Sequence, residues 1–158
     1  MARKQRKTMI IGWQEWIALP ELGVSAVKAK VDTGAKTSSL HAYHIEEYTY
    51  NGAPHVRFEV HPVQRNQRIT RVCEAKIIDY RKVKSSSGES EERPVIVTQL
   101  SLGDATWEIE LNLTNRDYMG FRMLLGREAL RQRLLIDAGS HFLHGRKTAK
   151  SVVQLYKG

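Results

Sequence analysis

The stretch Val31-Asp32-Thr33-Gly34-Ala35 decides how the rest of this chain is interpreted. Before it, apolar Val27, Ala29 and Val31 alternate with Lys28 and Lys30, which is the period-two pattern of a half-buried strand. Asp32 therefore stands at a strand end, and the small residues after it allow a tight turn beside its carboxylate. A carboxylate placed in this way is suited to activating a water molecule. The alternative is an ordinary turn or N-cap aspartate.

A second informative segment, Met123–Leu130, reads as a buried apolar strand, a glycine and a short helix. Together the two segments resemble the retropepsin-like aspartic proteases, in which an Asp-Thr-Gly-Ala loop carries the catalytic carboxylate. In that family an apolar run followed by Gly-Arg packs beside the loop. The resemblance therefore implies that Asp32 is catalytic, that Thr33, Gly34 and Ala35 form its loop, and that Leu125, Gly126 and Arg127 support it.

A closer resemblance is to a small bacterial family described as ATP-dependent zinc proteases and associated with RimK-type glutamate ligases. The matching segments are 30–42, 93–97, 111–116 and 124–130, and the resemblance extends from about Gly12 to Leu143. A lone Asp-Thr-Gly is a weak signal, whereas four matched segments in the same order are highly specific. The resemblance implies a peptidase that trims glutamate-rich tails, such as those on the C-terminus of a small-subunit ribosomal protein.

Composition favours one domain in the cytoplasm. The 158 residues are enough for one core, 41% of them are apolar, and there is no run long enough for a membrane span. The basic start lacks the apolar continuation of a signal peptide. Cys73 is the only cysteine, which excludes an internal disulfide and fits a reducing compartment. We expect a flexible basic arm over 1–8, a retropepsin-like peptidase domain over 9–145 and a basic C-terminal tail over 146–158.

The net charge of +8 is concentrated at the two ends of the chain. Residues 1–7 carry four basic side chains and no acidic one, and residues 116–158 carry nine against three. The residues between them carry twelve against fourteen. Basic ends attract anionic partners such as nucleic acid, the ribosome surface or an acidic peptide. The alternative is a solubilising surface with a disordered tail.

Turn residues and alternating patterns divide the chain into short strands. Strands are expected over 10–31 with a break at Pro20, in a hairpin over 48–60, over 71–83, and in a pair at 95–102 and 107–113. Residues 127–134 are the segment expected to be helical, and 135–136 form a short strand. Many short strands with regular turns predict an all-β fold, a closed acid-protease (retropepsin-like) barrel with one short C-terminal helix.

A single Asp-Thr-Gly has a consequence for assembly. Hydrolysis by carboxylates needs two of them sharing a proton, because two like charges held so close cannot both be ionised. Asp79 and Asp137 lack a following Thr-Gly, and Asp104 and Asp117 fall in turns or loops. We therefore expect a two-fold homodimer in which Asp32 of each subunit completes the pair.

The resemblance also implies a flap and a substrate cleft. The flap candidate is the 81–93 segment, whose tip is Ser85, Ser86, Ser87 and Gly88; the alternative is a disordered surface loop. The candidate substrate-binding residues are basic: Lys36 beside the Asp32 loop, and Arg81, Lys82 and Lys84 on the flap arm. They favour an acidic substrate, although an ordinary polar loop at Lys36 explains the same residues. By the family pattern Thr33 bonds between subunits under the dyad, and Arg127 is structural.

Metal and cofactor chemistry find little support in the residues. His41-x-x-His44 and His141-x-x-His144 have loose metal-ligand spacing, but a zinc site needs three or four convergent ligands. A phosphate-binding Gly-x-x-x-x-Gly-Lys motif does not occur. We therefore predict no metal and no cofactor.

The sequence supports a dimeric aspartic-type endopeptidase in which paired Asp32 carboxylates activate a water molecule. Its rival is a non-catalytic binding module of the same fold that docks on RNA, the ribosome or a glutamate-ligase partner. A third interpretation, a metallopeptidase, depends on the family description alone.

Overall fold

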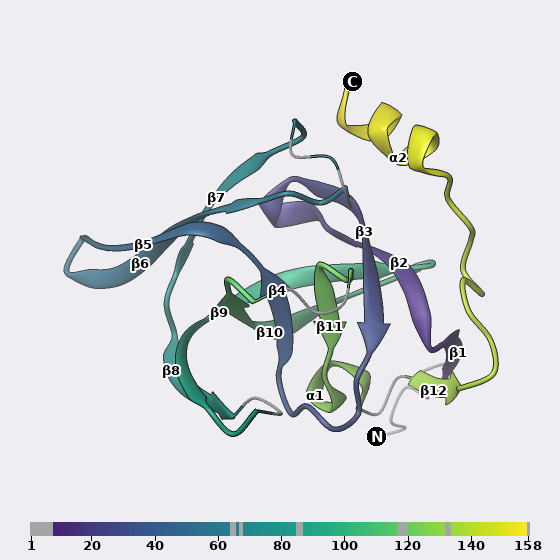
Figure 1. The fold of residues 1–158 in the computed structure, drawn as a ribbon, viewed down its shortest axis with the longest axis horizontal. Helices are drawn as coiled ribbons and strands as arrows, with labels where there is room; N and C mark the ends of the chain where they lie inside the picture. The colour runs from purple at the N-terminus through teal and green to yellow at the C-terminus, as the bar shows by residue number, and fades with distance from the viewer. Residues whose placement is uncertain are drawn as a thin grey trace, which may run out of the picture.

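A computed structural model describes residues 8–63, 66, 68–84, 87–116, 120–131 and 134–157. Short strands dominate it (Figure 1). The elements are β1 (Met9–Gly12), β2 (Gln14–Leu19), the 3-10 turn η1 (Pro20–Leu22), β3 (Val24–Val31), β4 (Ser38–His41), β5 (Tyr43–Tyr50), β6 (Ala53–Val60), β7 (Arg71–Lys76), β8 (Asp79–Lys84), β9 (Ser90–Leu102), β10 (Ala105–Thr114), β11 (Met123–Leu125), α1 (Arg127–Leu130), β12 (Leu134–Asp137) and α2 (Ala149–Tyr156).

Within the described residues a closed barrel forms the body of the molecule. Its strands follow the order β10-β4-β11-β3-β2-β9, and β9 closes the ring by pairing with β10, while β8 extends the sheet beyond β9. Two of the pairings are parallel, β4 with β10 and β3 with β11, and they bring segments far apart in the sequence side by side (Figure 1). The predicted all-β closed barrel is confirmed.

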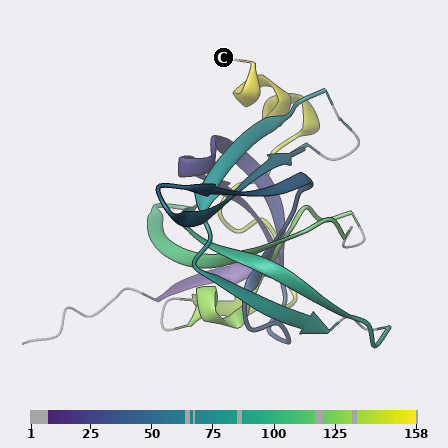
Figure 2. The same ribbon diagram turned by 90° about the vertical axis from the view of Figure 1, so that its left-hand side faces the viewer.

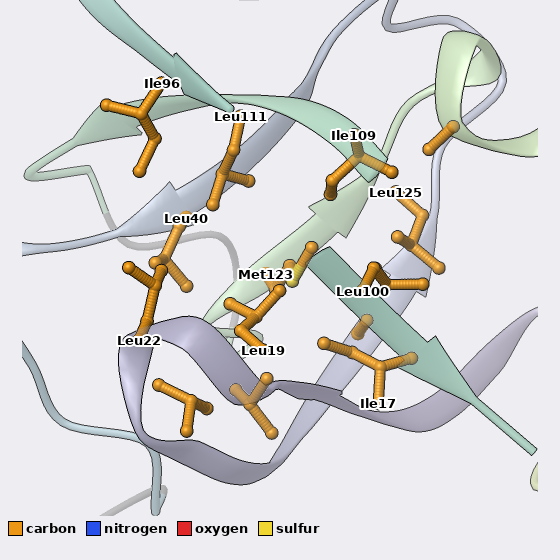
Figure 3. Close-up of a cluster of buried hydrophobic side chains, with 14 of the residues drawn as sticks. Ile17, Leu19, Leu22, Leu40, Ile96, Leu100, Ile109, Leu111, Met123 and Leu125 are labelled. Atoms are coloured by element: carbon orange, nitrogen blue, oxygen red, sulfur yellow. The ribbon is translucent and has the colours of Figure 1, made fainter. Parts of the chain in front are cut away.

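The barrel is filled by one apolar core (Figure 3). On β10 the predicted alternation holds, because Trp107, Ile109, Leu111 and Leu113 are all buried while Glu108 and Glu110 are exposed. The other strands contribute fully buried side chains from their inward faces, namely Leu19, Val27, Leu40, Ile96, Leu100, Met123 and Leu125. Burying such side chains stabilises the fold by about 1.5–3 kcal/mol each.

The segment 71–83 is not one strand, as the sequence analysis expected, but two strands in different sheets. β7 belongs to a three-stranded sheet with β5 and β6, whereas β8 pairs with β9. The change of partner takes place between two neighbouring residues: the Ile77 amide donates to the Pro54 carbonyl at 3.0 Å, and the Ile78 amide donates to the Val95 carbonyl at 2.8 Å. Alternation is interrupted at this point, because Ile77 and Ile78 are consecutive apolar residues and residues 78–80 are all exposed, a signal that the sequence analysis did not use.

The ends of the chain differ from expectation in three places. The region 10–31 contains three strands, because β1 leaves the barrel to pair in parallel with β12. The helix expected over 127–134 is α1, which ends at Leu130. The segment expected to be a tail contains α2, which begins at a capping box formed by Thr148 and Ser151. At eight residues, α2 is shorter than the window over which helical periodicity is recognised in a sequence.

A buried carboxylate fixes the chain before α2. Glu15 is fully buried and accepts backbone hydrogen bonds from Gly12 at 2.8 Å, Leu143 at 2.9 Å and His144 at 3.1 Å. A buried carboxylate is tolerated when several donors satisfy it. Glu15 therefore holds residues 143–144 against β2. No helix in the described part of the chain is long and apolar enough to cross a membrane.

Helix α2 is anchored through one phenol. The Tyr156 hydroxyl donates to the Ala26 carbonyl at 2.6 Å and accepts from the Ala26 amide at 2.9 Å, and both residues are buried. We predict that Tyr156→Phe lowers the free energy of unfolding by about 1–3 kcal/mol, because it leaves two buried backbone groups unpaired. Urea unfolding measures the change. Tyr50→Phe, the same change on a tyrosine that is 59% exposed, should shift stability by under about 0.5 kcal/mol. Equal effects of the two variants would contradict the anchoring role.

Candidate active site

The Asp32 loop is positioned by the parallel pairing of β3 and β11. Val31 lies in register with Leu125, and the Asp32 amide donates to the Leu125 carbonyl at 2.9 Å. The two strands therefore end together, with Asp32 leaving one and Gly126 leaving the other. Asp32 is partly buried, and Thr33 and Gly34 after it are exposed.

Backbone hydrogen bonds close the loop around the Asp32 side chain. The Gly34 amide donates to Asp32 Oδ1 at 3.1 Å, and the Ala35 amide donates to the Asp32 carbonyl at 3.2 Å. These contacts fix one carboxylate oxygen at the start of a turn. They match the loop that the sequence predicts for Asp32, Thr33, Gly34 and Ala35.

Helix α1 supports the loop from the other side. The Arg127 amide donates to the Ala35 carbonyl at 2.9 Å, and the Glu128 amide donates to the Lys36 carbonyl at 3.1 Å. The Arg127 guanidinium reaches the carbonyls of Thr33 and Gly34, each at 3.4 Å. The first turn of α1 therefore binds loop carbonyls through both backbone and side chain, which is a structural use of Arg127.

Position 126 requires a glycine, because the backbone of residues 36–38 lies too close for a side chain. A Cβ built on Gly126 would lie 2.6 Å from the Thr37 carbonyl carbon and 2.9 Å from the Lys36 oxygen. The Gly126 amide also donates to the Ser38 hydroxyl at 3.0 Å. Residues 36–38 therefore pass directly over the glycine, which joins the Asp32 loop to the start of α1.

On the side of the barrel wall opposite the core lies a set of buried polar side chains, which we call the outer polar face. It comprises Ser39 and His41 on β4 and Asn112 and Thr114 on β10, covered by Arg93 of β9. Parallel pairing places Asn112 beside Ser39 and Thr114 beside His41. Arg93 Nη1 donates to Ser39 Oγ at 3.2 Å and to Asn112 Oδ1 at 3.1 Å.

The outer polar face brings together segments that are far apart in the sequence. Segments 30–42, 93–97 and 111–116 supply its members, and 124–130 supplies the neighbouring strand β11. Sequence reasoning missed Arg93, Asn112 and Thr114 as members of one cluster. The available signal was the polar residues interleaved with apolar ones on β10, but it does not show what covers that face.

The predicted flap is a hairpin of β8 and β9. The two strands pair from Asp79 with Val95 to Lys84 with Ser90, and Figure 2 shows the hairpin extending beyond the body of the barrel. Ser85 and Ser86 lie outside the described residues. Ser87 and Gly88 are exposed at the turn, and Gly88 adopts φ +89°.

The cations of the flap arm differ in their surroundings. Arg81 pairs with Glu110 at 2.7 Å and with Asp79 at 3.0 Å, and it donates to the Thr37 hydroxyl at 3.0 Å. These acidic partners raise the pKa of Arg81 above its usual value. Arg81 therefore ties the base of the hairpin to the segment after the Asp32 loop, whereas Lys82 and Lys84, like Lys36, are exposed.

Cys73 and the histidine pair His41 and His44 do not form a second reactive centre or a metal site among the described residues. Burial raises the pKa of the Cys73 thiol to about 11, and the thiol donates to the Leu22 carbonyl at 3.3 Å, so Cys73 is unsuited to nucleophilic chemistry near neutral pH. His41 is buried beside Arg122, whereas the His44 side chain is 75% exposed. Among the described residues no group of three or more His, Cys, Asp or Glu is placed to hold a metal ion.

The family described as "Retropepsin-like aspartic endopeptidase RimB" matches residues 10–147, which include the loop, the outer polar face and α1. This chain belongs to the RimB-like family. The predicted resemblance to retropepsin-like proteases is thereby confirmed, as is the retropepsin-like character of the barrel.

Other proteins with similar sequences carry a different name. "Probable alpha-L-glutamate ligase" of Shewanella pealeana is 52% identical over 147 residues, covering 93% of this chain and 32% of the relative. The protein of the same name from Desulfotalea psychrophila is 50% identical, again over 147 residues and with the same coverage. The chain thus spans about a third of the length of the curated relatives it matches.

A solved structure shares the fold of this RimB-like chain. The crystal structure of Lpg0085 from Legionella pneumophila, a protein with unknown function (DUF785), superposes with a TM-score of 0.73 at 32% identity. The match covers 88% of this chain and 100% of that one.

Gly126→Ala tests the close approach between the Asp32 loop and α1. We expect a loss of about 1–3 kcal/mol in the free energy of unfolding, because the added methyl group meets backbone atoms that cannot move without displacing the loop. Chemical denaturation measures it. Gly139→Ala is the matched control, since its Cβ would meet its nearest neighbour at 3.6 Å, an ordinary contact. If Gly126→Ala were as stable as Gly139→Ala, the packing of residues 36–38 over Gly126 would be wrong.

Proposed function

We propose that this chain is a dimeric aspartic peptidase whose nucleophilic water lies between the Asp32 carboxylates of two subunits. The observation that carries the proposal is the Asp32 loop, in which β11 and α1 bind the backbone around partly buried Asp32 and the Gly34 amide donates to its carboxylate, beside exposed Thr33 and Gly34. Membership of a family described as aspartic endopeptidases supports it.

The second carboxylate is best supplied by a second copy. The Asp79 carboxylate is paired with Arg81, and the Asp137 carboxylate accepts from the Gly139 amide and the Ser140 hydroxyl in its own turn. Asp104 is exposed in the turn between β9 and β10. Asp117 lies outside the described residues. A two-fold axis beside the exposed part of the Asp32 loop brings two equivalent carboxylates together without any further residue.

The chemistry follows from the proton shared by the pair. The ionised carboxylate removes a proton from the water, and the water oxygen attacks the peptide carbonyl carbon. The protonated carboxylate donates its proton to the carbonyl oxygen, which removes charge from the tetrahedral intermediate. In the collapse of the intermediate, the carboxyl that took the proton of the water gives it to the amine nitrogen as the C–N bond breaks. One hydroxyl of the intermediate passes its proton to the other carboxylate as it becomes the carbonyl of the product acid, so the pair again holds one proton. The base and the acid thus exchange roles within one cycle.

The proposed substrate is a glutamate-rich peptide or protein tail, for example on a ribosomal protein. Relatives named as probable alpha-L-glutamate ligases contain a segment like this chain as about a third of their length. A domain that removes glutamates is a reasonable counterpart to an activity that adds them. The +8 net charge and the exposed Lys36, Lys82 and Lys84 favour an acidic substrate.

The rival function is a non-catalytic module that binds a glutamate-ligase partner, RNA or the ribosome. The name of the relatives favours a ligase partner in particular. The rival keeps the same fold and charge but needs no Asp32 pair. Binding that persists in Asp32→Asn, with no cleavage by the wild-type protein, would favour it.

Mixing subunits tests the shared dyad. Asp32→Asn subunits mixed with an equal amount of wild-type protein should lower activity to about half of that of the wild-type protein alone, because random pairing leaves a single carboxylate in every mixed dimer. Cleavage of a glutamate-tailed peptide is the measurement, after subunit exchange is complete. Asp104→Asn subunits, which change an exposed aspartate in a turn, should not inhibit. Full activity of the mixed dimer, or a monomer at all working concentrations, would refute the dyad.

Salt tests the preference for acidic substrates. Raising NaCl from about 0.05 to about 0.5 M should increase KM for a glutamate-tailed peptide roughly threefold or more, because salt screens exposed charges. KM for a glutamine-tailed analogue should change less. The Lys82→Glu and Lys84→Glu double variant should have the same selective effect. Reversing Lys147 and Lys150, which are exposed near and on α2, is the charge-matched control. Equal, salt-insensitive turnover of both peptides would assign the basic surface to another role.

A further inference from the structure

One end of the outer polar face carries an arginine that has only neutral partners among the described residues. Arg122, just before β11, places Nη1 3.1 Å from His41 Nδ1 and 3.1 Å from the Tyr43 hydroxyl. Both partners act as acceptors, so neither compensates the charge of the guanidinium. The Arg122 Nε is buried and has no hydrogen-bond partner among the described residues.

The other arginines around this face are compensated by carboxylates. Arg81 pairs with Asp79 and Glu110, Arg93 with Glu91 at 3.2 Å, and Arg116 with Glu91 at 3.2 Å. Arg122 forms no ion pair within the described part of the chain. A partly buried guanidinium with a spare donor and no counter-charge is costly, and an incoming anion would remove that cost.

Aromatic rings line the space beside Arg122. The Tyr43 ring stacks on His61 with centroids 4.2 Å apart and an interplanar angle of 19°, and it lies 4.6 Å from the His41 ring. The Arg122 guanidinium lies 5.9 Å from the centre of the Tyr43 ring. His61 Nδ1 is likewise buried without a hydrogen-bond partner among the described residues. The cluster therefore contains two buried nitrogen atoms that remain to be paired.

The charges around His61 agree with an anion site. Burial and the positive charge of Arg122 lower the pKa of His61, whereas Glu59 opposes this effect. Glu59 itself lies 3.6 Å from His44, on the exposed side of the cluster. His61 is thus neutral near pH 7, and a carboxylate bound beside Arg122 could accept a hydrogen bond from its ring.

The cluster lies within reach of a peptide held at Asp32. Arg122, which directly precedes β11, lies three residues before Leu125, and the Leu125 carbonyl accepts a hydrogen bond from the Asp32 amide. Three residues of extended chain span about 10 Å. Leu124, between the two positions, is buried at 8% exposure.

We propose that Arg122, with Tyr43 and His61 beside it, is a specificity subsite that binds a carboxylate of the substrate about three residues from the bond at Asp32. This inference rests on the proposed function for the substrate it names. Its ligand is a carboxylate, either of an acidic side chain or of a chain terminus.

Binding to the Asp32→Asn protein tests the subsite apart from catalysis. The probes are an N-acetylated, C-amidated pentaglutamate, the same peptide with a free C-terminus, and the amidated pentaglutamine. Arg122→Gln in this background should weaken the Kd for amidated pentaglutamate by about tenfold or more and leave pentaglutamine unchanged. Arg57→Gln, which removes an exposed arginine on β6, is the charge-matched control. Weakening confined to the free-acid peptide would assign the subsite to the terminal carboxylate, whereas equal weakening by the two variants would overturn it.

A second measurement leaves Arg122 and its neighbours unchanged, so it remains valid if Arg122→Gln fails to fold. Amidated pentaglutamate should shift the NMR resonances of the His61 ring in the Asp32→Asn protein, while those of His55 on β6 stay in place. Unchanged His61 resonances at saturating peptide would also overturn the subsite.

The failure of the subsite and the failure of the peptidase function can be distinguished. Cleavage by wild-type protein with an unchanged KM in Arg122→Gln refutes the subsite alone. Arg122-dependent binding without any cleavage refutes the peptidase alone.

Discussion

The parallel contact between the ends of β3 and β11 is the constraint on which the active-site arrangement depends. One hydrogen bond, from the Asp32 amide to the Leu125 carbonyl, sets where the carboxylate leaves the sheet. Gly126 then has to pass beneath residues 36–38, and its amide takes the Ser38 hydroxyl as acceptor. The positions of β11, the Asp32 loop and α1 therefore depend on one another, because these segments pack so closely that no side chain fits between them.

The outer polar face adds a second level of organisation. Buried polar groups are costly unless they are paired, and a fully paired network specifies one arrangement. Arg93 joins β9 to Ser39 and Asn112, and Glu91 accepts from Thr114 at 3.1 Å. The base of the β8–β9 hairpin is thus fixed to β4 and β10 while its tip extends away from the barrel (Figure 2).

The parts predicted from the sequence are those governed by local patterns. Alternation identified the core face of β10, and the Asp-Thr-Gly-Ala turn identified the Asp32 loop. Long-range pairing was not accessible: the adjacent Ile77 and Ile78 interrupt the alternation but do not show which strands pair on either side, and α2 depends on Tyr156 reaching Ala26. Members of the outer polar face were missed for the same reason, since no single strand pattern shows that Arg93 will cover Asn112.

Net charge alone is a poor guide to what this surface binds. Some of the basic side chains are locally neutralised, because Arg81, Arg93 and Arg116 each contact carboxylates of neighbouring strands. Exposed ion pairs contribute little to affinity, about 0–1 kcal/mol each, and salt weakens them further. Compared with an exposed lysine, a partly buried guanidinium acts over a shorter range but is far more selective. A ligand has to match the positions of its N–H donors as well as its charge. A preference for acidic tails would thus come from two layers: exposed lysines that attract any anion, and Arg122, which can distinguish a carboxylate from an amide.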